Sequence, residues 1–293
     1  MSNSLPFTIS NRFRLQREIF TGQSLAPKGV YFDTKTRTLV FAKIILNSDS
    51  GKSEIGYHRL LYKYAKQIKN SNVLIPRPIG IYKTDVGPVY LSQYFPKAKS
   101  VLETNIKSKT NHYLRVLKFL ARVSKKKVSD SKSVKLNFKP GYYIVSTLPY
   151  YLLRNLISYP NRAGAFAKAY LGLIKYLPTW ASLDSDFACH GDVNVTNIMS
   201  LGSKTLLLDF SQCCNSHKYY DLSQALNSSW MQPGFQSLLS SRIAKIFSLN
   251  LFDLRLLNSF VVYNLLQRLS VRYPRFKQSK FYLDRLNKLS ALL

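Results

Sequence analysis

The pattern of hydrophobic and polar positions changes its period near residue 100. Before it, residues 39–45 and 89–95 are β-prone runs rich in β-branched and aromatic side chains. Residues 29–32 are a similar short run, and the polar segment 33–37 separates them from 39–45, which predicts an antiparallel hairpin. Residues 53–69 carry apolar side chains at helical spacing instead. The first part of the chain therefore predicts a small sheet with one helix.

Beyond residue 100 the apolar side chains recur mostly with the helical period. The predicted helices cover residues 104–125, 162–177, 220–231, 235–248, 253–272 and 276–292, and the polar, basic residues 128–140 predict a loop. The whole pattern is typical of an α+β protein. We expect a small β-rich N-terminal lobe over residues 1–95 and a larger, mainly helical C-terminal lobe over residues 96–293.

Composition supports a folded protein with a real core. The chain has 293 residues, of which 46% are hydrophobic and 19% charged, whereas disordered chains are poor in apolar residues. No stretch reaches the roughly 18 uncharged apolar residues of a membrane span, because Arg154 and two prolines interrupt residues 142–160. The N-terminus lacks a signal-peptide layout. Three cysteines, two of them adjacent, suit a reduced, cytoplasmic setting.

The charge is strongly unbalanced. Lys and Arg number 43 against 14 Asp and Glu, so the formal net charge is +29. Such a field attracts polyanions, which include nucleic acid, anionic lipid surfaces and phosphorylated glycans. A solvated basic surface without a dedicated partner is the alternative.

Residues 189–211 differ from the helical segments around them. Cys189-His190-Gly191-Asp192 opens a loop that contains Asn197, and a short strand, a tight turn and an apolar strand lead to Asp209-Phe210. A hairpin of these two strands would bring Asn197 and Asp209 together, with Asp192 just before them. Phosphoryl transfer from a nucleotide needs one carboxylate for the attacking hydroxyl, oxygen ligands for Mg²⁺ and a lysine for the phosphates. Asp192, the pair Asn197 and Asp209, and Lys43 are these types of residue.

The pattern H-G-D-x-x-x-x-N, followed by an apolar run and D-F, resembles the aminoglycoside phosphotransferase and choline kinase family. The resemblance extends over roughly residues 20 to 230 and implies a protein-kinase-like fold, ATP and Mg²⁺ as cofactors, and a phosphotransferase acting on an alcohol. It implies that Asp192 is catalytic, that Asn197 and Asp209 are metal ligands, and that Asp221 braces the catalytic loop.

Upstream, Lys43 lies in an apolar strand similar to the lysine-bearing strand of this family, and Glu54 resembles the ion-pair partner of that lysine. The segment that corresponds to the adenine-binding hinge ends with Gln93, Tyr94 and Phe95.

Two departures from kinase patterns stand out. No G-x-G-x-x-G loop exists, and residues 22–29 occupy its place, with Ser24 and Lys28 as weaker candidates for phosphate contacts. Ser211 follows Asp209-Phe210 where protein kinases have glycine, which argues against a standard protein kinase.

The acceptor is less defined than the reaction. The resemblance allows aminoglycosides, choline, ethanolamine, thiamine and sugars, including those of lipopolysaccharide. Acids are scarce beyond Asp221, where only Asp253 and Asp284 remain, although Asp184 and Asp186 precede the catalytic loop. This scarcity favours a neutral or anionic acceptor, such as a sugar of a membrane glycolipid.

Residues 125–127 and 142–154, which are basic and aromatic, would then contact the anionic inner face of a membrane. Two alternatives stay open. One is an aminoglycoside, choline or thiamine kinase. The other is a non-catalytic kinase-like module whose basic surface binds membrane or, less favoured, nucleic acid.

Overall fold

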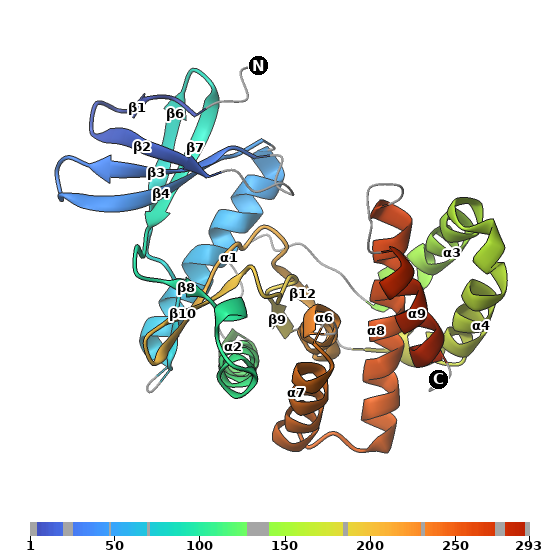
Figure 1. The fold of residues 1–293 in the computed structure, drawn as a ribbon. Helices are drawn as coiled ribbons and strands as arrows, with labels where there is room; N and C mark the ends of the chain where they lie inside the picture. The colour runs from blue at the N-terminus through green and yellow to red at the C-terminus, as the bar shows by residue number, and fades with distance from the viewer. Residues whose placement is uncertain are drawn as a thin grey trace.

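The computed structural model describes residues 5–19, 26–46, 48–68, 71–127, 141–183, 187–229, 232–272 and 279–290. A sheet from the N-terminal part of the chain stands at one end, and helices from the C-terminal part form the other end (Figure 1). The predicted α+β class and its division into a β-rich and a helical part are confirmed.

The N-terminal sheet has six antiparallel strands in the order β1-β2-β3-β4-β7-β6. The strands are β1 (Thr8–Ile9), β2 (Phe13–Ile19), β3 (Lys28–Asp33), β4 (Thr38–Ile44), β6 (Pro78–Thr84) and β7 (Gly87–Gln93). The predicted hairpin is β3 and β4, in which Lys28 pairs with Lys43. Tyr31, Val40 and Leu91 belong to the buried cluster of this sheet.

The predicted helix after β4 is α1 (Ser48–Gln67), which begins five residues earlier than expected and lies beside the N-terminal sheet (Figure 1). It leads to a second, four-stranded sheet in the order β5-β11-β10-β8. Its strands are β5 (Val73–Leu74), β8 (Lys99–Ser100), β10 (Ile198–Leu201) and β11 (Lys204–Leu207). Strand β5 runs parallel to β11, so segments about 130 residues apart in sequence lie side by side.

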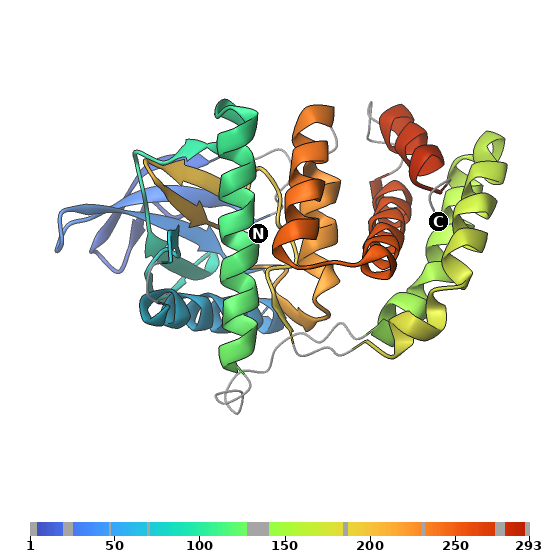
Figure 2. The same ribbon diagram turned by 90° about the horizontal axis from the view of Figure 1, so that it is seen from below.

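The C-terminal part is mainly helical, as predicted. Its helices are α2 (Ile106–Lys127), α3 (Gly141–Ser158), α4 (Ala163–Ile174), α5 (Leu177–Ala181), α6 (Tyr219–Ser229), α7 (Pro233–Ile246), α8 (Leu251–Arg272) and α9 (Ser279–Ser290), with short 3-10 turns η1 (Val101–Glu103) and η3 (Pro160–Arg162). A third sheet pairs β9 (Phe187–Cys189) with β12 (Cys214–Ser216). Figure 2 shows α2, α6 and α7 between the sheets and the outer helices α3, α4 and α9.

The main core fills this helical part, where Trp180 stacks on Phe260 with ring centroids 4.9 Å apart. Helix α3 was not predicted as a helix, because its apolar residues show no clear helical period and Pro149 lies inside it. The predicted loop 128–140 lies outside the described residues. Within the part of the chain that the structure describes, no helix is both long and apolar enough to cross a membrane.

Candidate active site

A tight loop joins β9 to β10 and carries the His-Gly-Asp motif. Gly191 has φ +80°, and a Cβ there would lie 2.1 Å from the carbonyl oxygen of Gln212, so the position accepts only glycine. The backbone N–H groups of His190 and Gly191 donate to the two carboxylate oxygens of Asp221, each at 2.8 Å. Asp221 lies in α6 and is buried, and burial raises the pKa of its carboxyl group. The predicted bracing contact of Asp221 is therefore present.

Asp192 is held by two side-chain amides. Asn194 donates to Asp192 Oδ1 at 2.7 Å and Asn197 to Asp192 Oδ2 at 2.9 Å. Asn194 also accepts hydrogen bonds from the backbone N–H groups of Thr196 and Asn197 through its Oδ1 atom. Asn194 thus organises the loop, a role that the sequence pattern did not indicate. Since the amide of Asn197 faces Asp192, the Oδ1 atom of Asn197 is the side suited to bind a cation.

The β10–β11 hairpin brings Asp209 to this loop, as predicted. Ile198 pairs with Leu207, and the N–H of Leu208 donates to the carbonyl of Asn197 at 2.9 Å. Asp209 itself has φ 58°, a left-handed conformation that aspartate tolerates better than most residues. The hairpin therefore places Asn197 and Asp209 side by side.

Two lysines from the N-terminal sheet face Asp209. Lys43 Nζ lies 2.8 and 2.9 Å from the two carboxylate oxygens of Glu54 and 3.5 Å from Asp209 Oδ1. Lys28 Nζ lies 3.4 Å from Asp209 Oδ2. Burial opposes ionisation of Asp209, but the charges of Lys43 and Lys28 outweigh it and hold the pKa of this carboxyl well below its usual range. Burial also opposes the charge of Lys43, yet Asp209 and Glu54 raise the pKa of its ammonium group.

Lys28, a weaker candidate from the sequence, thus belongs to the cluster, because β3 pairs with β4 and places Lys28 opposite Lys43. Ser24, the other weaker candidate, lies outside the described residues.

A buried histidine, His58, packs against the residue that follows Asp209. His58 Nε2 donates to the carbonyl of Pro76 at 2.7 Å, so its Nδ1 accepts from the hydroxyl of Tyr90, also at 2.7 Å. The ring stacks on Phe210, with centroids 4.2 Å apart. Burial lowers the pKa of His58 to about 4, which keeps the ring neutral at physiological pH. The spacing of residues along the chain gave no sign of these contacts.

Residues 115–251 match the model of a family described as the phosphotransferase enzyme family. No curated protein sequence matches this chain. Solved structures of aminoglycoside phosphotransferases and choline kinases share the kinase-like fold of this chain. This confirms the predicted resemblance and the predicted fold class.

One of them is a mutant aminoglycoside phosphotransferase APH(4)-Ia bound to AMP-PNP and hygromycin B, with 11% identity and a TM-score of 0.66 over 97% of this chain and 94% of that one. Another is the GDP complex of an aminoglycoside 2'-phosphotransferase-IIIa mutant, with 14% identity and a TM-score of 0.67 over 95% and 92% of the two chains. The choline kinase LicA from Streptococcus pneumoniae has 11% identity and a TM-score of 0.58 over 95% of each chain.

The predicted hinge residues lie where β7 ends and the chain turns toward β8. Gln93 Oε1 accepts from the backbone N–H of Arg77 at 3.4 Å, and Tyr94 Oη accepts from Arg17 at 2.6 Å. These hydrogen bonds do not reach the lysine and aspartate cluster, so the contact of residues 93–95 with a purine stays a prediction.

Cys189, Cys213 and Cys214 are buried and free of disulfides. Among the described residues no group of three or more His, Cys, Asp or Glu side chains could hold a metal ion by itself.

Proposed function

We propose that this chain transfers the γ-phosphate of ATP to a hydroxyl group of a small molecule or glycan. The observation that carries the proposal is the joint placement of Lys43, Glu54 and Asp209, beside the loop in which Asn197 holds Asp192. These side chains come from four separate segments, and their types match the needs of phosphoryl transfer.

The cationic side of the site would bind the triphosphate. Lys43, positioned by Glu54, neutralises the inner phosphates, and Lys28 adds a second positive charge on the same side of Asp209. The Oδ1 atom of Asn197 and the carboxylate of Asp209 would hold Mg²⁺, which commonly takes one or two protein ligands and completes its shell with phosphates and water. When bound, Mg²⁺ would neutralise part of the negative charge of the phosphates. The backbone at residues 93–95 would hold the purine.

Asp192 would act on the acceptor. Its carboxylate accepts the proton of the hydroxyl while the hydroxyl oxygen forms a bond to the γ-phosphorus, and the bond from that phosphorus to the β-phosphate oxygen breaks to leave ADP. The amides of Asn194 and Asn197 orient the carboxylate for this proton transfer.

We further propose a neutral or anionic acceptor, such as a sugar on a membrane glycolipid like lipopolysaccharide. Asp253 is already engaged by the hydroxyl of Tyr219 and by Lys218, which lowers the pKa of its carboxyl group, and Asp284 is exposed on α9. The predicted acids Asp184 and Asp186 lie outside the described residues. A cationic acceptor therefore finds few acidic partners in the described C-terminal part.

The test is to incubate the protein with Mg²⁺ and γ-labelled ATP and to offer two acceptor pools. One pool is an envelope glycolipid extract, and the other contains aminoglycosides, choline and thiamine. Label that enters the glycolipid with the wild type, but not with Asp192→Asn, supports both parts of the proposal. Label in the soluble amines would overturn the acceptor class and keep the reaction. No transfer of label to any acceptor, with no binding of Mg-ATP, would favour the non-catalytic alternative.

A further inference from the structure

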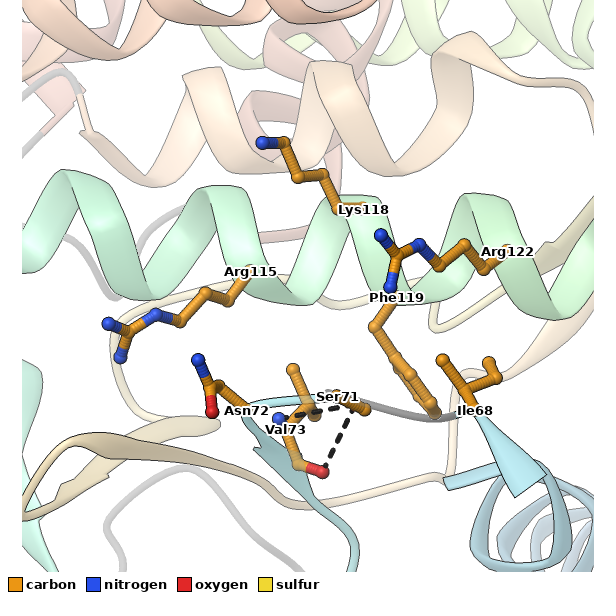
Figure 3. Close-up of a pocket in the computed structure, with 8 residues that line it drawn as sticks. All are labelled: Ile68, Ser71, Asn72, Val73, Arg115, Lys118, Phe119 and Arg122. Carbon is orange, nitrogen blue, oxygen red and sulfur yellow. Dashed lines mark hydrogen bonds between the residues drawn. The ribbon is translucent and has the colours of Figure 1, made fainter. Parts of the chain in front are cut away.

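A basic pocket lies where the end of α1, strand β5 and helix α2 meet (Figure 3). Its volume is about 110 Å³, enough for a small polyatomic group. The residues that line it are Ile68, Ser71, Asn72, Val73, Arg115, Lys118, Phe119 and Arg122. None of them belongs to the site of Lys43 and Asp192.

All the charged side chains that line this pocket are positive. Arg115, Lys118 and Arg122 follow one another at spacings of three and four residues, so they lie along one face of α2. None of the residues that line the pocket is acidic, and no ion pair between described residues involves these three. Helix α2 carries no Asp or Glu along its 22 residues. A bound anion would relieve the repulsion between these charges.

Arg115, Arg122 and Asn72 supply hydrogen-bond donors at the edges of the pocket. In Figure 3 the guanidinium group of Arg115 extends from α2 toward the side of Asn72, and that of Arg122 lies along α2 above Phe119. The side-chain amide nitrogen of Asn72 points toward α2, whereas Lys118 extends away from the strand. The guanidinium group of Arg115 is held in place by a hydrogen bond, in which Nη1 donates to the carbonyl of Ser203 at 2.6 Å. A planar guanidinium offers two parallel donors that match the spacing of phosphate oxygens.

The floor of the pocket is apolar. Ile68, Val73 and Phe119 are buried, with Phe119 only 2% exposed. An apolar floor lowers the local dielectric constant, and charge-assisted hydrogen bonds above it are stronger than those on an open surface. Arg115 is half-buried beside this floor, whereas Lys118 and Arg122 are exposed.

We propose that this pocket is a binding site for a phosphate group, with Arg115, Arg122 and Asn72 as its donors. The group is carried either by the headgroup of a phosphorylated lipid or by a soluble phosphate compound. The proposal is independent of phosphoryl transfer at Asp192, since it needs neither nucleotide nor acceptor.

The test uses two probes. Inorganic phosphate is titrated while NMR follows the side-chain amide of Asn72, assigned with an Asn72→Ala variant, so that binding near Lys43 does not enter the readout. Co-sedimentation compares vesicles of phosphatidylcholine alone with vesicles that also contain phosphatidic acid. Arg115→Gln/Arg122→Gln removes the donors. Arg162→Gln/Arg242→Gln removes two charges from exposed positions elsewhere and serves as the matched control.

We expect the donor variant to lose at least tenfold in affinity for a probe that the wild type binds, and the control to stay within twofold. Binding of phosphate without vesicles assigns a soluble ligand, and binding to phosphatidic acid vesicles assigns the lipid headgroup. If neither probe binds the wild type, or if the control loses as much as the donor variant, the site does not exist. Arg122→Gln alone leaves the contact between Arg115 and Ser203 intact and replaces the double variant if that variant misfolds; it should weaken binding severalfold.

Discussion

At the scale of single residues, a buried histidine makes the fold sensitive to acid. His217 stacks on Phe260 with centroids 4.0 Å apart, and neither of its ring nitrogens has a hydrogen-bond partner within the described residues. Burial lowers the pKa of His217 to about 3. The unfolded chain, with an ordinary histidine pKa near 6.5, therefore takes up this proton first as the pH falls.

This linkage predicts how stability depends on pH. The pKa is lower in the folded state, so the free energy of unfolding falls as the pH drops from about 6.5 toward 3, and at pH 5 His217 alone should cost about 2 kcal/mol relative to pH 7.5. His217→Phe keeps a ring against Phe260 and should remove this part of the loss. Urea unfolding of both proteins at pH 7.5 and pH 5 measures it, and an equal acid loss in the variant would refute the assignment.

The catalytic carboxylate gives a second prediction at this scale. Asp192→Asn keeps the size of the side chain but cannot accept the proton of an acceptor hydroxyl. We expect turnover to fall by a factor of about 10² to 10⁴, with little change in nucleotide affinity, because Lys43 and Asp209 are untouched. Single-turnover transfer from labelled ATP and equilibrium binding separate the two effects. Transfer at the wild-type rate would remove Asp192 from its proposed role.

At the scale of elements, two glycines test the shape of the catalytic loop. Gly191 and Gly202 both have positive φ, but a Cβ at Gly191 would meet the backbone of Gln212, whereas nothing lies within 4 Å of one at Gly202. Gly202→Ala should cost about 1 kcal/mol through its backbone conformation alone and leave activity intact. Gly191→Ala should cost more and abolish activity, because the loop must move and carry Asp192 with it. Thermal unfolding and transfer assays compare the variants, and equal effects on both would contradict the loop geometry.

Patterns that are local in sequence were predicted best. The β3–β4 hairpin and the β10–β11 hairpin follow from short runs of apolar residues around polar turns, and both are present. The parallel pairing of β5 with β11 was missed, because a two-residue strand has no periodicity to detect. The hydrogen bond of His58 with Tyr90 and its stacking on Phe210 also join distant segments, and spacing along the chain does not show such contacts.

At the scale of the whole molecule, the site exists only because two parts of the chain meet. Lys28 and Lys43 come from the N-terminal sheet, and Asp209 comes from the segment after β11, about 165 residues beyond Lys43. The division into lobes at residues 1–95 and 96–293 stays a proposal, since β5 lies before the boundary and pairs with a strand after it. Motifs identified the types of residue in the site, but the fold determines that these residues share one place.

The most direct test of the account is the Mg²⁺ dependence of ATP binding, measured by titration calorimetry with the wild type and with Asp209→Asn. The variant keeps Lys43, Glu54 and Asp192 and removes one proposed metal ligand. We predict that Mg²⁺ strengthens ATP binding by the wild type at least tenfold and has little effect on the variant. Absence of ATP binding by the wild type, or the same Mg²⁺ dependence in both proteins, would contradict the proposed site.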